Sequence, residues 1–276
     1  MISQLLLSFS LLTTSFCHTS NKILGGHKIS IAEVPYQVAT FWNSRQSCGG
    51  SLISKEFVLS AAHCFDEHVP DKILTVRVGT STPKDGSGMS INVKYIYNHP
   101  MYDTISNDYD FSLLRLYEVK SFPSVVKFAK LPTVYDQLNE GDDVFISGWG
   151  RTEFGKTSDV LLRAMVQVQS TESCSKDYQN MFVITERMIC ARRIGGKVDA
   201  CQGDSGGPLV RKSDGILFGI TSFGCSCGDP RYAGVYANVS SALEWIYETI
   251  SSDSGIANDQ EPNQCQYNFT LPQHLV

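Results

Sequence analysis

The chain has no strong excess of charge of one sign. Its 276 residues include 23 Lys or Arg and 28 Asp or Glu, which gives a formal net charge of -5. A balance this mildly acidic argues against a nucleic-acid partner and against a polybasic membrane surface. The charge leaves the nature of other partners open.

The chain also lacks an apolar run long enough to cross a bilayer. A transmembrane helix needs about 20 apolar residues, whereas the leucine-rich stretch from Leu5 to Leu12 is much shorter and is followed by small and polar residues. This order is typical of a cleavable secretory leader. We therefore expect residues 1–17 to be a signal peptide, whose end could extend to residue 20, and the protein to be secreted. A buried N-terminal helix or anchor is the alternative.

Metal-ligand spacing is absent from the cysteines. No pair of the nine has the tight two-plus-two spacing of a zinc module, and Cys225 and Cys227 are too close together and too isolated to form one. Nine cysteines behind a leader favour an oxidising destination and disulfides instead. We expect neither a metal site nor a cofactor.

Helical periodicity is scarce, and short β-rich runs with turn signals between them recur along the chain. This pattern predicts an all-β barrel or sandwich. The expected strands lie at 57–62, 73–78, 91–97, 111–116, 144–147, 161–168, 216–222 and 234–239.

One segment has a helical period. Within residues 241–250, Ser241 and Glu244 have the spacing of a capping box, and Leu243, Ile246 and Ile250 fall on one face together with Tyr247. We expect one terminal amphipathic helix there. Residues 251–276 are polar and lack periodicity, which predicts a tail outside the core.

A serine lies in the glycine-rich segment Gly203-Asp204-Ser205-Gly206-Gly207-Pro208. Neighbours without side chains leave the Ser205 oxygen and the surrounding backbone N–H groups accessible. The segment also fits the nucleophile elbow of lipases and esterases, in which the acid and the histidine follow the serine on a parallel sheet with helices. Here the candidate histidine and acid precede Ser205 and helices are scarce, so chain order disfavours the lipase interpretation.

Serine is a poor nucleophile unless a base takes its proton and a carboxylate orients that base. His63 follows the apolar run Leu59-Ser60-Ala61-Ala62, and Asp110 directly precedes an apolar strand. A lone histidine or aspartate of this kind is usually structural. Three such segments in one chain favour a catalytic triad of His63, Asp110 and Ser205.

These segments together resemble the trypsin and chymotrypsin family of serine proteases, over residues 23–250. The blocks that carry the resemblance, in the family's order and spacing, are those around His63, Asp110 and Ser205, with Ser147-Gly148-Trp149-Gly150, Ser222-Phe223-Gly224 and Gly234-Val235-Tyr236. The resemblance implies two antiparallel six-stranded β-barrels with the active site between them. It also implies a serine endopeptidase that forms an acyl-enzyme, with an oxyanion hole made by the N–H groups of Gly203 and Ser205.

The resemblance further implies activation by cleavage. Lys22-Ile23-Leu24-Gly25-Gly26 is similar to the family's activation junction, so residues 18–22 would be an activation peptide and another protease would cut after Lys22. The freed ammonium of Ile23 would pair with Asp204. A surface lysine followed by a turn is the alternative.

Asp199 lies six residues before Ser205, where the resembling proteases have the base of their primary pocket, and a carboxylate there implies cleavage after Arg or Lys. The substrate-binding positions implied are Asp199, Ala200, Gln202, Ser222, Phe223, Gly224 and Gly234. Ala200 replaces a serine that trypsins often have, so we expect Arg to be preferred over Lys. Phe223 and Ala233 replace a usual Trp and Pro, which puts the subsite preference in doubt.

The loop at 79–89 lacks the pair of acidic ligands of calcium-binding trypsins, so we expect no calcium site. Family register implies the disulfides Cys48–Cys64, Cys174–Cys190 and Cys201–Cys227. It also places one common family bridge at Val144 and Arg211, where both cysteines are missing.

Two cysteines, Cys225 and Cys265, remain once Cys17 leaves with the leader. We expect them to pair, with free thiols or intermolecular pairing as the alternatives. Asn238 and Asn268 begin glycosylation sequons.

Protein or peptide substrates are the expected partners, and proteinaceous inhibitors are candidates. A catalytically dead fold that acts as a binding protein, and a chymotrypsin-like or elastase-like specificity, are the competing hypotheses.

Overall fold

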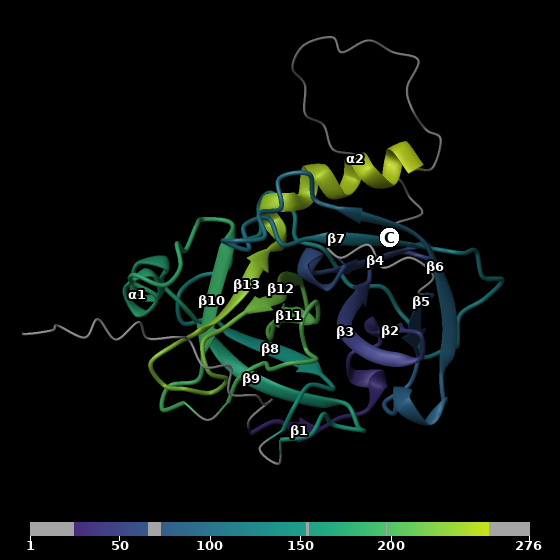
Figure 1. The fold of residues 1–276 in the computed structure, drawn as a ribbon, viewed down its shortest axis with the longest axis horizontal. Coiled ribbons are helices and arrows are strands. Elements are labelled where there is room, and N and C mark those ends of the chain that lie inside the picture. Colours follow the sequence, from purple (N-terminus) through teal and green to yellow (C-terminus); the bar gives the residue numbers. More distant parts are fainter. Residues whose placement is uncertain (1–24, 66–72, 153–154, 197, 254–276) are drawn as a thin grey trace, which may run out of the picture.

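The computed structural model describes residues 25–65, 73–152, 155–196 and 198–253. Within them the chain forms two antiparallel β-barrels that lie side by side, with a helix at the C-terminal end of the fold (Figure 1). This confirms the two-barrel architecture with a C-terminal helix that the resemblance implied. No helix among these residues is long and apolar enough to cross a membrane.

The first barrel closes in the strand order β2-β3-β4-β7-β6-β5. Its interior holds Val38, Leu52, Val76 and Leu114, all of which are fully buried. The strands are β2 (Gln37–Trp42), β3 (Arg45–Leu52), β4 (Phe57–Ser60), β5 (Leu74–Val78), β6 (Met89–Asn98) and β7 (Ser112–Leu116).

The second barrel runs in the order β8-β9-β10-β13-β12-β11, and the pairing of β11 with β8 closes it. The short β1 (His27–Lys28) adds a seventh strand beside β9. The strands are β8 (Asp143–Gly148), β9 (Leu162–Gln169), β10 (Met188–Arg192), β11 (Pro208–Arg211), β12 (Leu217–Phe223) and β13 (Gly234–Asn238).

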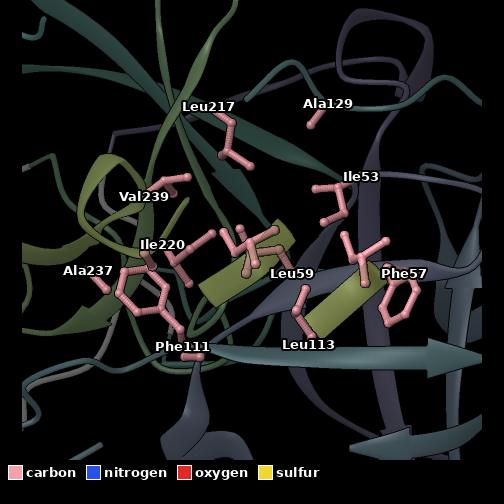
Figure 2. Close-up of a cluster of buried hydrophobic side chains, with 14 of the residues drawn as sticks. Ile53, Phe57, Leu59, Phe111, Leu113, Ala129, Leu217, Ile220, Ala237 and Val239 are labelled. Carbon is pink, nitrogen blue, oxygen red and sulfur yellow. The ribbon is translucent and has the colours of Figure 1, made fainter. Parts of the chain in front are cut away.

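A shared apolar cluster joins the two barrels (Figure 2). Leu59 and Phe111 come from the first barrel and Ile220 and Ala237 from the second, and all four are buried. Helix α2 (Leu243–Asp253) adds Ile246 to the same cluster. Burial of this apolar surface fixes one barrel against the other, so residues from both can form one rigid site.

The predicted terminal helix is present, but its start differs from the expectation. A 3₁₀ turn, Val239–Ala242, precedes α2. The cap is Asn238, whose side chain accepts the N–H of Ser240 at 3.2 Å. Ser241 instead donates its hydroxyl to the carbonyl of Asn238 at 2.7 Å, so the capping box predicted from Ser241 and Glu244 is wrong.

The helix also ends later than expected, at Asp253 rather than residue 250. Asp253 accepts hydrogen bonds from the Tyr97 hydroxyl at 2.6 Å and from Arg115 Nε at 2.5 Å. Residues 251–253 therefore belong to the packed fold rather than to the expected tail.

The structure contains the disulfides Cys48–Cys64, Cys174–Cys190 and Cys201–Cys227. Val144 and Arg211 are Cα partners on β8 and β11, directly opposite each other as a bridge at these positions requires. Cys225 is disulfide-bonded. The positions Lys22, Ile23, Cys17, Cys265 and Asn268 lie outside the described residues.

Candidate active site

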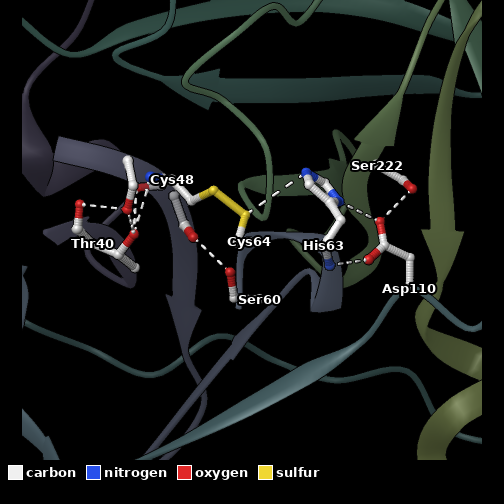
Figure 3. Close-up of a disulfide and its surroundings, with 9 residues drawn as sticks. Thr40, Cys48, Ser60, His63, Cys64, Asp110 and Ser222 are labelled. Atoms are coloured by element: carbon white, nitrogen blue, oxygen red, sulfur yellow. Dashed lines mark hydrogen bonds and ion pairs between the residues drawn. A yellow bond between two sulfur atoms is a disulfide. The ribbon is translucent and has the colours of Figure 1, made fainter. Parts of the chain in front are cut away.

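His63 and Asp110 meet because the strands that lead to them are paired. His63 lies in the 3₁₀ turn Ala62–Cys64 directly after β4, and Asp110 lies directly before β7. β4 and β7 are antiparallel, with Ser60 opposite Ser112 at this end of the pair. A separation of 47 residues in the chain therefore becomes a hydrogen-bond distance (Figure 3).

The Asp110 carboxylate is fully buried and accepts three hydrogen bonds. Its Oδ1 accepts the backbone N–H of His63 at 2.9 Å. Its Oδ2 lies 2.7 Å from His63 Nδ1 and accepts the Ser222 hydroxyl at 2.5 Å. A carboxylate can only accept, so Nδ1 must carry the proton of a neutral imidazole, and Nε2 is then left to take a proton from another group.

The disulfide Cys48–Cys64 lies beside the imidazole (Figure 3). Its Cys64 Sγ is 3.8 Å from His63 Nε2. In the described part of the chain, Cys48, His63 and Cys64 are the one group with the composition of a metal site. The two sulfurs are bonded to each other and are not thiolates, so this group does not have the donors of a metal centre.

Ser205 lies in a turn that packs onto the strand end leading to His63. The Ser205 carbonyl accepts the N–H of Gly49 at 2.7 Å. Gly206 has a φ of 78°, and a Cβ there would overlap the Ser60 hydroxyl, three residues before His63. Ser205 and His63 therefore lie on neighbouring segments, although the structure has no hydrogen bond between these two described side chains. Catalytic hydrogen bonds are often long without substrate and tighten in its complex.

The backbone around Ser205 has two unused donors. Gly203 has a φ of 97°, which turns its N–H in a direction that a residue with a side chain rarely adopts. Among the described residues, neither the N–H of Gly203 nor that of Ser205 donates to a protein acceptor. Two N–H groups of one turn that have no protein acceptor are what an oxyanion needs.

Asp204 is buried beneath this turn and accepts two backbone hydrogen bonds. The donors are the N–H groups of Gly150 at 2.8 Å and of Cys201 at 3.0 Å. A Cβ at Gly148 or Gly150 would overlap the carboxylate, which explains the glycines of this segment. Burial raises the pKa of Asp204 to about 7. No lysine or arginine of the described residues pairs with it.

A pocket of about 200 Å³ opens beside Ser205. Two glycines face each other across it, since a Cβ on Gly224 would have the Cα of Gly234 as its nearest neighbour, 3.8 Å away. Larger residues at either position would fill the space. Its lining includes Asp199, Ala200, Gln202, Ser205, Thr221, Ser222, Phe223, Gly224, Ser226, Gly234, Val235 and Tyr236.

Asp199 is the charged group of this pocket and is nearly fully buried. Its Oδ2 accepts the N–H of Gly228 at 3.0 Å, whereas Oδ1 has no hydrogen-bond partner in the described structure. Burial raises the pKa of Asp199 to about 7. The Tyr236 hydroxyl is also unpartnered, and both oxygens lie within 3 Å of the position that a Cβ of Gly234 would occupy.

All seven residues expected to bind substrate line this pocket, and two features were not expected. Tyr236 adds a second polar atom at the base of the pocket, and its motif Gly234-Val235-Tyr236 was the available signal. Ser222, expected to bind substrate, also donates to Asp110, which the sequence does not reveal because the two belong to different barrels. Phe223 stacks obliquely on Phe182 at 5.1 Å between ring centres.

The chain matches the protein-family model described as Trypsin over residues 23–246. It is 41% identical over 232 residues to Trypsin 5G1 of Aedes aegypti, covering 83% of this chain and 85% of that protein. It is 38% identical over 232 residues to Vitellin-degrading protease of Bombyx mori, covering 84% and 86%.

A third relative is longer than this chain. Transmembrane protease serine 5 of Homo sapiens is 34% identical over 237 residues, which are 83% of this chain and 52% of that protein. The family match includes all the described residues of the site above.

Proposed function

The chain belongs to the trypsin family and is a serine-type endopeptidase, and on that premise we propose that it cleaves peptide bonds after arginine or lysine, with arginine favoured. The single observation that carries the specificity is the unpartnered Oδ1 of Asp199 at the base of the pocket. An unpaired buried acceptor is unfavourable. An arginine or lysine side chain would relieve it, whereas an aromatic or small side chain would not.

Arginine suits this pocket better than lysine. A guanidinium has five N–H donors in a planar fork and can reach both Asp199 Oδ1 and the Tyr236 hydroxyl, the two unpartnered oxygens. The compact ammonium of lysine spans less of the distance between these two oxygens than a guanidinium does, and the methyl group of Ala200 offers it no additional acceptor.

The chemistry follows from the donors and acceptors of the site. Ser205 Oγ attacks the scissile carbonyl, and its proton passes to His63 Nε2 while Asp110 stabilises the imidazolium. The N–H groups of Gly203 and Ser205 bind the oxyanion, and each such donor is worth about 3–4 kcal/mol. His63 then returns the proton to the leaving amine, which leaves an acyl-enzyme that water hydrolyses by the same route.

We also propose that the chain is made as a secreted zymogen. The support is Asp204, a buried carboxyl whose pKa is raised by burial and which has no cationic partner among the described residues. Cleavage after Lys22 would free the Ile23 ammonium, whose pairing with Asp204 would order the turn that holds Gly203 and Ser205. The leader at residues 1–17 is the basis for secretion.

Two covalent features complete the proposal. Cys225 pairs with Cys265, which would tether the tail next to Gly224 at the edge of the pocket. Of the two sequons, the one at Asn268 carries sugar, because the side-chain amide of Asn238 already caps a 3₁₀ turn and donates to the Glu186 carbonyl at 3.4 Å. Non-reducing peptide mapping tests both, and a free Cys265 would exclude the tether.

The test is hydrolysis of four matched peptides, ending in Arg, Lys, Phe or Ala before the scissile bond, by protein that begins at Ile23. We expect kcat/KM to rank Arg above Lys, and both far above Phe and Ala. Preferred cleavage after Phe or Ala would contradict the specificity. A Ser205→Ala variant that keeps most of the activity would contradict the mechanism, and an equally active precursor would contradict the zymogen.

A further inference from the structure

The loop that presents Asp110 has an unusual backbone. Asn107 and Tyr109 have φ angles of 55° and 52°, the left-handed region that residues with side chains seldom occupy. The N–H of Phe111 donates to the carbonyl of Tyr109 at 2.7 Å, so Asp110 is the middle residue of a tight three-residue turn. A residue with a side chain in the left-handed region costs about 1–3 kcal/mol of free energy, and this conformation persists only where the surrounding structure holds it.

Asp108, two residues before Asp110, is bound by residues of the second barrel. Arg187 Nε lies 3.0 Å from both carboxylate oxygens of Asp108, and Arg187 Nη2 donates to Oδ2 at 2.6 Å. The Thr185 hydroxyl donates to Oδ1 at 2.9 Å. These bonds hold the pKa of Asp108 below its ordinary value although burial raises it. The fork geometry fixes both the position and the orientation of the carboxylate.

Tyr109, between the two aspartates, is held through its ring. The Arg187 guanidinium lies over the ring at 4.8 Å from its centre. The ring also stacks on His99, at 4.5 Å between centres and an interplanar angle of 16°, and His99 contacts Trp245 of α2 at 4.8 Å. Arg187 therefore contacts both residues that immediately precede Asp110, and aromatic packing ties them to the terminal helix.

We propose that Arg187 is a positioning residue for proteolysis, which aims the Asp110 carboxylate at His63 by holding Asp108 and Tyr109. Arg187 is not among the residues that line the substrate pocket, and the partners of its guanidinium in the described structure are Asp108 and Tyr109, so it acts through the loop. The inference rests on the proposed role of Asp110 as the acid that orients His63. Two residues of the second barrel thus hold this loop. Ser222 binds the Asp110 carboxylate directly, and Arg187 holds the backbone that carries Asp110.

The experiment compares processed wild-type protein with Arg187→Gln, Arg187→Lys, Asp108→Asn and the double variant Asp108→Asn/Arg187→Gln. We expect Arg187→Gln to lower kcat on an Arg peptide about tenfold to a hundredfold, because a displacement of about 1 Å can have an effect of this size. KM should change less than about twofold, since the pocket is untouched. Asp108→Asn should give a similar loss, and the double variant little more than either single one.

The chain offers a closely matched control in Arg211. Its Nε lies 3.2 and 3.0 Å from the two oxygens of Asp214, its Nη2 donates to Asp214 at 2.6 Å, and its guanidinium lies 4.7 Å from the Phe218 ring centre. Arg211→Gln removes an equivalent carboxylate fork and ring contact away from the Asp110 loop, together with bonds to the Gln137 carbonyl at 2.6 Å and to Asp136 at 3.4 Å. It should keep the kcat of the wild type even where thermal unfolding shows a similar loss of stability.

Two results would overturn the inference: a wild-type kcat in folded Arg187→Gln, or an equal fall of kcat in Arg211→Gln. If Arg187→Gln does not fold, Arg187→Lys decides the question, because it keeps the charge and loses the fork. A kcat at least about threefold below wild type supports the inference, and an unchanged kcat overturns it. A wild-type enzyme that fails to cleave Arg peptides would instead contradict the proposed function.

Discussion

The two barrels contribute buried carboxylates of different kinds. Asp110 of the first barrel is satisfied by the fold itself, with three hydrogen bonds from His63 and Ser222. Asp199 and Asp204 of the second barrel accept only backbone hydrogen bonds, and burial raises the pKa of each to about 7. The part of the site that orients His63 is therefore complete in the folded chain. No lysine or arginine of the described residues pairs with Asp199 or Asp204, and in the proposed function their cationic partners are the substrate arginine and the Ile23 ammonium.

The largest expected effect comes from removing the charge of the Asp110 carboxylate. Asp110→Asn would keep an oxygen toward the backbone N–H of His63 and turn an amide NH₂ toward Nδ1, which stabilises the wrong tautomer of the imidazole. We expect kcat to fall about 10⁴-fold on an Arg peptide. Ser222→Ala, which removes one of the three hydrogen bonds, should cost less than about tenfold. Comparable losses in the two variants would contradict the account of Asp110.

The next largest effect comes from the pocket carboxylate. Asp199→Ser leaves a bound guanidinium without its buried counter-charge, which costs about 3–5 kcal/mol and corresponds to roughly a hundredfold to a few thousandfold in kcat/KM. The same variant should cleave a Phe peptide at least as well as the wild type does. Equal losses on Arg and Phe peptides would mean that Asp199 supports the fold rather than the selection of substrate.

A smaller effect separates precursor from processed protein. A carboxyl with a pKa of about 7 in the fold and 3.8 unfolded destabilises the fold progressively as the pH rises from 3.8 to about 7, and the effect is constant above that. The proposed pairing with Ile23 would remove this loss of stability for Asp204. Between about pH 5 and 7, below the titration of a free α-amino group, the Tm of a Ser205→Ala precursor should therefore fall by a few degrees more than that of processed Ser205→Ala protein.

Groups that titrate in both forms contribute equally to the two changes of Tm and cancel in the comparison. They include Asp199 and the buried His99, whose pKa is lowered by burial. Parallel changes of Tm with pH in the precursor and the processed protein would show that Asp204 gains no cation on cleavage.

The smallest expected effect is a change of preference between two cations. Ala200→Ser adds a hydroxyl that can accept from a lysine ammonium, which is worth about 1 kcal/mol. The ratio of kcat/KM for Arg over Lys peptides should fall about fivefold, while the rate on the Arg peptide stays nearly constant. An unchanged ratio would mean that the hydroxyl does not reach the ammonium in this pocket.

Local sequence signals predicted eight of the strands and the terminal helix, but missed segments whose structure depends on distant contacts. β3 contains Cys48, Gly49 and Gly50, which resemble a turn. A Cβ at Gly49 would lie 3.1 Å from Gly207 of the second barrel, and one at Gly50 2.7 Å from Val58, so the first glycine allows close packing between the barrels and the second within the first barrel. The same limit affected the start of the terminal helix, where Ser241 had the spacing of a cap, whereas Asn238 caps the 3₁₀ turn that leads into α2.

The candidate site was easier to predict than the strands around it, because its residues lie in short motifs. His63, Asp110 and Ser205 stood out as a set of three segments, and Asp199 followed from its register in the family resemblance. The connections between barrels, Ser222 to Asp110 and Arg187 to Asp108, did not, because no local pattern joins residues 79 or more positions apart.

The most direct test of the account is covalent labelling by a phosphonate ester that carries an arginine-like side chain, followed by intact mass measurement and peptide mapping. Processed protein should take up one equivalent, attached to Ser205, and Asp199→Ser and the precursor should react far more slowly. Labelling at another residue, or an equal rate with a phosphonate that carries a phenylalanine-like side chain, would contradict the claim that Ser205 acts on arginine bound by Asp199.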